Sequence, residues 1–99
     1  MSQNSKYWVE MDADMEELVP KILEIKRQQA EEVSQASEER DFSRIKAIGH
    51  KIRGMHGIQQ INDLGTAIEN AAMDEKLQEI WKFNAELLDF LDHIEIHFK

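Results

Sequence analysis

The stretch between residues 48 and 57 reads Ile48-Gly49-His50-Lys51-Ile52-Arg53-Gly54-Met55-His56-Gly57. On a helix, which turns by about 100° per residue, the large apolar side chains of this region fall on one side. They are Phe42, Ile45, Ile48, Ile52 and Met55. His50 points almost directly away from them. The pattern therefore predicts an amphipathic helix that carries His50 on its solvent-facing side.

Three other segments also space their apolar residues as a helix does. The segment before the His50 helix contains Met15, Leu18, Val19, Ile22, Leu23, Ile25, Ala30 and Val33. The segment after it contains Ile58, Ile61, Leu64, Ile68, Ala71 and Ala72. The last segment contains Leu77, Ile80, Trp81, Leu87, Leu88, Leu91, Ile94 and Phe98. No β-type alternation of useful length is evident, so the sequence predicts four helices.

Acidic residues are placed to cap the starts of three of these helices. The predicted N-caps are Asp12 or Asp14, Asp41 and Asp74. Pro20 falls inside the first helical segment, so a short opening helix and a bend near Pro20 are expected there. The His50 helix is expected to end between Gly54 and Gly57, because glycines commonly close helices.

Four amphipathic helices with short connections favour an all-α, up-down-up-down antiparallel four-helix bundle. The 99 residues suffice for one domain, residues 1–99. Residues 12–99 are predicted to form the bundle, and residues 1–11 an N-terminal strap that covers it or staples the first helix. Large side chains are assigned to the core or to this cover: Met15, Met55, Met73 and Trp81 to the core, and Trp8 to the cover.

Composition narrows the functional classes. The formal net charge is −8, from 20 acidic and 12 basic residues, which argues against nucleic acid as a partner. Cysteine is absent, so disulfides and thiolate metal sites are excluded. No apolar run is long enough to span a bilayer, and no signal-peptide pattern begins the chain. We therefore expect a cytoplasmic protein with no membrane partner.

Basic and small residues surround His50 on the predicted helix surface. Lys46 and Ala47 lie one turn before it, and Arg53 and Gly54 lie one turn after it. Ser43 and Gly57 are one turn further away, and a third of all basic residues lie close by: Arg44, Lys46, Lys51 and Arg53. Glycine inside a helix costs about 1 kcal/mol, so its use here suggests that a partner must reach the imidazole. The positive charge predicted around His50 would favour binding of an anionic group.

The motif Gly49-His50-Lys51-Ile52-Arg53-Gly54 resembles that of the histidine-containing phosphotransfer (HPt) domains. The following helix closes on Leu64-Gly65-Thr66-Ala67-Ile68-Glu69-Asn70-Ala71, which also resembles that family. Similarity extends upstream to residues 17–24 and to Asp41-Phe42. Arg53 stands where the family has lysine, Met55-His56 where small residues follow the glycine, and the spacing from His50 to Gly57 is shorter than the family norm.

The resemblance implies that His50 is a phosphoacceptor, taking a phosphoryl group from one receiver-domain aspartate and passing it to another. It implies that Arg53 contacts the phosphoryl group, with Lys46 and Lys51 as further candidates and Gly54 and Gly57 in the partner-binding surface. The expected partners are response-regulator receiver domains and a sensor or hybrid histidine kinase. Such a carrier is a monomer, not an enzyme, and has no cofactor, because the receiver supplies the magnesium. The chain also lacks a phosphate-binding glycine loop.

Two alternatives remain open. The shorter spacing and Met55-His56 are compatible with an HPt-like adaptor or inhibitor that binds receivers or kinases without being phosphorylated. His93 and His97 are four residues apart in the predicted last helix, which is a possible spacing for a metal site. However, no Glu-x-x-His pair accompanies them, so no metal is expected. His56 is interpreted as a packing or capping residue.

Overall fold

The computed structural model describes residues 7–54 and 58–99, which are mainly helical. The four α-helices in these residues are α1 (Val19–Glu38), α2 (Phe42–Ile52), α3 (Gln59–Met73) and α4 (Leu77–His93). The remaining elements are β1 (Tyr7–Met11), η1, a short 3₁₀ helix (Ala13–Met15), and β2 (Ile94–Phe98). The prediction of a mainly helical chain with four helices is confirmed. The interpretations of Met55, His56 and Gly57 lie outside the described residues.

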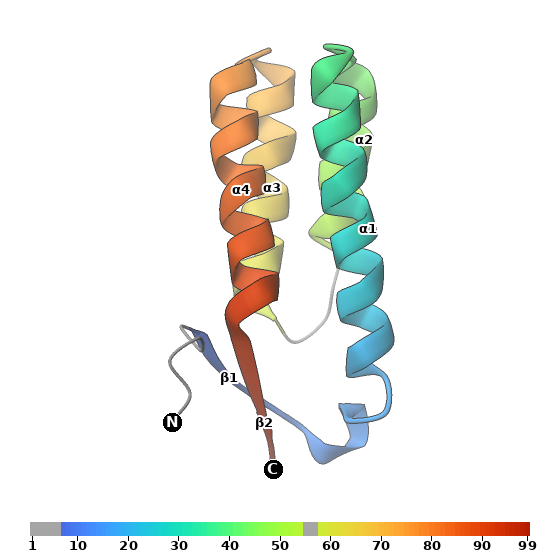
Figure 1. Ribbon diagram of the computed structural model, residues 1–99, viewed down its shortest axis with the longest axis vertical. Coiled ribbons are helices and arrows are strands. Elements are labelled where there is room, and N and C mark those ends of the chain that lie inside the picture. Colours follow the sequence, from blue (N-terminus) through green and yellow to red (C-terminus); the bar gives the residue numbers. More distant parts are fainter. Residues whose placement is uncertain (1–6, 55–57) are drawn as a thin grey trace.

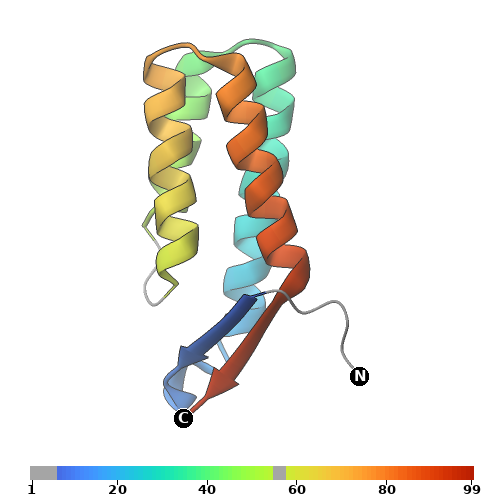
Figure 2. The same cartoon turned by 90° about the vertical axis from the view of Figure 1, so that its left-hand side faces the viewer.

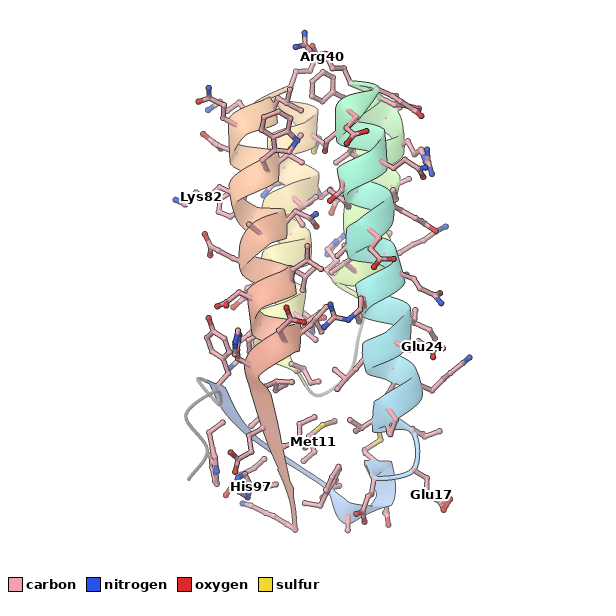
Figure 3. The ribbon with its side chains drawn as sticks, viewed as in Figure 1. Met11, Glu17, Glu24, Arg40, Lys82 and His97 are labelled. Carbon is pink, nitrogen blue, oxygen red and sulfur yellow. The ribbon has the colours of Figure 1, made fainter. Side chains whose placement is uncertain are left out.

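The helices form a closed ring of neighbours, in which α1 contacts α2, α2 contacts α3, α3 contacts α4, and α4 contacts α1. The α2–α3 contact is the most extensive. The turns between α1 and α2 and between α3 and α4 lie at one end of the molecule, and the two strands lie at the other (Figures 1 and 2). Arg40 marks the turn end, whereas Met11 and His97 mark the strand end (Figure 3).

The core is built mainly from the predicted apolar stripes, although Leu18 and Ile25 of the first stripe are 55% and 39% exposed. Its largest fully buried apolar side chains are Val33, Ile45, Ile52, Ile58, Ile61, Ile68, Ile80 and Leu87. The prediction that Met73 and Trp81 belong to the core is wrong, because their exposed fractions are 59% and 52%. Ile80, directly before Trp81, is fully buried and occupies the inward position, which turns Trp81 about 100° away. Met73 is the last residue of α3, beyond the buried Ala71 and Ala72.

A parallel pair of strands joins the two ends of the chain. β1 and β2 pair in register from Tyr7 with Ile94 to Met11 with Phe98. Val9 and Met11 belong to the buried core, and the side chains that pack against it from β2 are Ile94, Ile96 and Phe98. The predicted last helix was therefore too long, and the N-terminal strap contains a strand. Alternation of apolar and polar residues over only five positions is a weak signal for a strand. In addition, each strand pairs with one at the opposite end of the sequence.

The predicted helix starts are partly correct. The Asp41 side chain accepts a hydrogen bond from the backbone N–H of Arg44 at 3.2 Å, as expected for an N-cap. Asp74 instead follows the last residue of α3, and Lys76 precedes α4. Asp12 precedes η1 without a side-chain cap hydrogen bond and Asp14 lies within η1, so neither caps α1, which begins at Val19. Pro20 thus lies in the first turn of α1. Backbone N–H groups in that turn have no acceptor within the helix, so the absence of an N–H in proline costs no helical hydrogen bond.

The two turns at the end of the bundle repeat one geometry. Arg40 and Glu75 both have φ of 55°, in the left-handed region. Around Arg40, the N–H of Asp41 donates to the carbonyl of Ala36 at 3.0 Å, and the N–H of Arg40 donates to that of Ser37 at 3.1 Å. This is the Schellman arrangement, in which glycine is the preferred residue. Both positions therefore carry the conformational cost of a side chain at positive φ.

Arg40→Gly and Glu75→Gly are each expected to raise the free energy of unfolding by about 0.5–1 kcal/mol, because glycine adopts positive φ without a Cβ clash. Urea denaturation followed by circular dichroism measures the change. Arg40→Ala and Glu75→Ala are the matched controls, since alanine removes the same long side chains but keeps the Cβ. Equal effects of alanine and glycine would show that backbone strain is not the cause.

Candidate functional site

His50 lies on the exposed side of α2, as the helical pattern predicts. Its side chain is 63% exposed, whereas Ile48 and Ile52 on the opposite side of the helix are buried. Two features fix the orientation of α2: the Asp41 side chain caps its start, and its apolar stripe packs into the core. His50 is therefore held by a fixed backbone while its ring remains open to solvent.

A carboxylate and a guanidinium hold one edge of the His50 ring. Glu69 on α3 places Oε2 3.3 Å from His50 Nδ1. Its other oxygen, Oε1, pairs with Arg53 Nε at 2.8 Å. Arg53 also places Nη2 3.1 Å from His50 Nδ1. His50, Arg53 and Glu69 thus form one cluster, which we call the histidine triad.

The triad favours one tautomer of His50. Nδ1 faces both an acceptor, Glu69 Oε2, and a donor, Arg53 Nη2, and the neutral ring can hydrogen-bond to only one of them. The Glu69 side chain is 15% exposed and has little access to water, whereas the 42% exposed Arg53 can be solvated. A proton on Nδ1 that donates to Glu69 satisfies the less exposed group. That tautomer leaves an unprotonated nitrogen, Nε2, on the open side of the ring.

Within the described residues, no hydrogen-bond partner contacts Nε2 of His50. A shallow depression lies beside the ring, lined by Ser43, Lys46, Ala47, His50, Lys51 and Glu69. Lys46 and Lys51 thus line the same depression as His50. Arg44 does not join them, because its guanidinium pairs with Glu39 at 3.8 Å. The depression therefore combines an exposed imidazole nitrogen with two lysines and offers room for a small anionic group.

Glycines bring α3 close enough for Glu69 to reach His50. A Cβ added to Gly49 would lie 2.8 Å from the backbone nitrogen of Glu69. A Cβ added to Gly65 would lie 2.6 Å from the backbone nitrogen of Arg53. Cβ atoms essentially never lie so close to the backbone of another segment, so only glycine permits this approach of α2 and α3. Gly54 lies beyond the end of α2. The prediction that it is a glycine inside the His50 helix, leaving room for a partner, is therefore wrong.

Glu69 is the residue of the histidine triad that the sequence pattern did not single out. It follows the fully buried Ile68 on α3 and lies four residues after Gly65. A carboxylate next to a core position, one turn after a glycine, is the only local signal. Its distance to His50 depends on the packing of two helices, which the spacing within either helix does not show.

The pair His93 and His97 does not form a helical metal site. His93 ends α4 and contacts Asp89 through Nδ1, with 3.0 Å to Oδ1, whereas His97 belongs to β2. The His97 ring packs on Trp8 with 4.6 Å between ring centroids, and its Nε2 lies 2.6 Å from Glu95 Oε2. In residues 7–54 and 58–99, no group of three His, Cys, Asp or Glu side chains could hold a metal.

Comparisons with known proteins give no relatives: no family model, no curated protein and no solved structure matches this chain. Among the described residues, none of the helices is both long enough and apolar enough to cross a membrane. The function is therefore inferred from the chain's own residues, above all from the histidine triad.

Gly65→Ala is expected to lower the free energy of unfolding by about 1–2 kcal/mol. Overpacking costs up to about 3 kcal/mol, and alanine recovers about 1 kcal/mol of helix propensity. Urea denaturation measures the loss. Gly54→Ala is the control, because among the described residues a Cβ there would meet only the Lys51 carbonyl oxygen, at 3.3 Å, where a shift of a few tenths of an ångström relieves the contact. A Gly65→Ala protein as stable as the wild type would contradict the close α2–α3 contact.

Proposed function

We propose that this chain is a phosphotransfer protein that carries a phosphoryl group on Nε2 of His50, as an HPt domain does. It takes the group from the aspartyl phosphate of one receiver domain and passes it to the aspartate of another. The observation that carries the proposal is the exposed His50 ring, whose Nδ1 faces Glu69 while Nε2 stays open beside Lys46 and Lys51. The expected setting is a cytoplasmic signalling pathway, in which the protein acts as a monomer.

The transfer step uses Nε2 as the nucleophile. Its lone pair attacks phosphorus, the Nε2–P bond forms, and the bond from phosphorus to the donor aspartate breaks, with the electron pair leaving on the carboxylate. The ring becomes an imidazolium that still carries the Nδ1 proton, and the Glu69 carboxylate at 3.3 Å offsets its charge. Transfer to the next receiver reverses these changes. The receiver supplies the aspartate and the magnesium ion.

Positive side chains would stabilise the oxygens of the transferring group. Arg53 engages Glu69 through Nε and places Nη2 3.1 Å from Nδ1, and its other terminal nitrogen, Nη1, would be the group that reaches a phosphoryl oxygen. Lys46 and Lys51 line the depression beside the ring and can contribute as point charges. Gly54 lies two residues after the end of α2, and we propose that it belongs to the surface that the partner contacts; Gly57, the other candidate, lies outside the described residues.

The proposal includes an up-down-up-down antiparallel bundle covered by the N-terminal segment. The turns of residues 39–41 and 74–76, both at one end of the molecule, support that topology (Figure 2). Such a frame keeps α2 and α3 side by side along their length. His50 and Glu69 then stay in contact while a receiver domain approaches the open side of α2.

Incubation with a phosphorylated receiver domain is expected to label the wild-type protein with phosphate that is stable to alkali and labile to acid. His50→Gln is expected to abolish the label, because its amide is not a nucleophile. Arg53→Ala is expected to slow transfer by about 100-fold, the usual cost of losing a group that stabilises developing charge. Arg53→Lys retains the charge and is expected to lose less.

His97→Gln is the matched control, because it removes an imidazole of β2, at the strand end of the molecule, and is expected to leave labelling unchanged (Figure 3). Label that persists in His50→Gln would contradict the proposal. Receiver binding without any labelling of the wild type would instead identify an HPt-like adaptor or inhibitor.

A further inference from the structure

Lys26 occupies a position where the α1 stripe calls for an apolar residue. It lies between Val19 and Ala30 on the buried side of the helix and is only 3% exposed. Burying an ammonium group is costly unless hydrogen bonds replace its water. Burial accordingly lowers the pKa of Lys26 below the usual value for lysine. The buried ammonium of Lys26 therefore requires hydrogen-bond acceptors within the protein.

The partners of Lys26 are at the end of the helix that carries His50. Nζ donates to the carbonyl oxygen of Lys51 at 3.0 Å and to that of Ile52 at 3.2 Å. It also donates to Oε1 of Gln29 at 3.1 Å. An ammonium has three N–H donors, so all three are used. Two of them satisfy carbonyls in the last turn of α2, where the partial negative charge of the helix is concentrated.

The same turn carries two members of the histidine triad, His50 and Arg53. Arg53 directly follows the two carbonyls that Lys26 binds, and its own N–H donates to the carbonyl of Gly49 at 3.2 Å. From the other side, Gly65 of α3 allows the backbone of Arg53 to approach closely. The end of α2 is thus held by Lys26 from α1 and by Gly65 from α3. Displacing this turn would move Arg53 relative to His50 and Glu69.

We propose that Lys26 is the positioning residue of the phosphotransfer site. By binding the Lys51 and Ile52 carbonyls, it fixes the last turn of α2 and thereby the placement of Arg53 and His50 against Glu69. It acts through these backbone groups and does not touch the phosphoryl group itself. The positioning is a property of the chain alone, whereas its effect on phosphotransfer rests on the proposed function.

Lys26→Met tests the proposal, because methionine keeps an unbranched chain but removes the ammonium. Lys21→Met is the matched control on the same helix, since the Lys21 side chain is 72% exposed and pairs only with Glu24 in the described structure. If Lys26→Met does not fold, Lys26→Gln retains an N–H donor of similar shape. Each variant is compared with the wild type by three measurements.

The first measurement is hydrogen exchange at the N–H groups of Arg53 and Gly54, with Glu75 and Lys76 in the distant turn as internal references. The second is the nitrogen NMR spectrum of the His50 ring. The third is the rate of His50 phosphorylation by phosphoramidate, which needs no partner protein. In that reaction the Nε2–P bond forms, the P–N bond of the donor breaks, and ammonia leaves.

In Lys26→Met, exchange at Arg53 and Gly54 is expected to be about tenfold faster, as after loss of a helix cap, and exchange at Glu75 and Lys76 unchanged. The ring signals of His50 are expected to shift, and its phosphorylation to slow by about tenfold. Lys21→Met is expected to match the wild type in all three measurements.

Unchanged exchange at Arg53 and Gly54, or equally faster exchange at Glu75 and Lys76, would overturn the positioning role. The second result would mean that Lys26 stabilises the whole fold. A wild-type protein that is phosphorylated neither by phosphoramidate nor by a receiver would overturn the proposed function. The exchange rates and ring signals would then still decide whether Lys26 positions the end of α2.

Discussion

The site depends on the close backbone contact between α2 and α3. Gly49 and Gly65 have no Cβ, so the two helices approach until the backbone of Glu69 lies against Gly49. With larger residues at these positions, the helices would separate, and the Glu69 carboxylate would lose its contact with the His50 ring. The orientation of one exposed side chain is thus set by packing in the interior. The partial burial of Glu69 makes its hydrogen bonds stronger than those of a fully solvated carboxylate.

This arrangement gives the two nitrogens of the His50 ring different surroundings. Nδ1 contacts Glu69 and Arg53, whereas Nε2 has no hydrogen-bond partner among the described residues and is the nitrogen that the proposal assigns to the phosphoryl group. The chain is acidic overall, with a net charge of −8, yet Lys46, Lys51 and Arg53 are placed at the ring. A phosphoryl group bound at Nε2, as proposed, would therefore have basic side chains beside it although the protein is acidic overall. The buried Lys26 adds a further constraint, because it ties the end of α2 to α1.

Features within one helix could be predicted from the sequence, and features between distant segments could not. The exposed face of α2, its apolar stripe and the Asp41 cap follow from local spacing, and the structure contains them. The contact between Glu69 and His50 depends on helix packing, and no local pattern encodes it. The pairing of β1 with β2 joins the two ends of the chain, so the last helix was predicted too long. The helical spacing of Trp81 predicts a core position, but Ile80, the residue before it, occupies that position in the structure.

The most direct test of the central claim is to locate the phosphorus atom on the phosphorylated protein. Histidine labelled with ¹⁵N in both ring positions allows phosphorus–nitrogen coupling to be measured by NMR after exposure to a phosphorylated receiver domain. We predict a single bonded nitrogen, Nε2 of His50, with the proton remaining on Nδ1 beside Glu69. Phosphorus bonded to Nδ1 of His50, or to another histidine, would contradict the account.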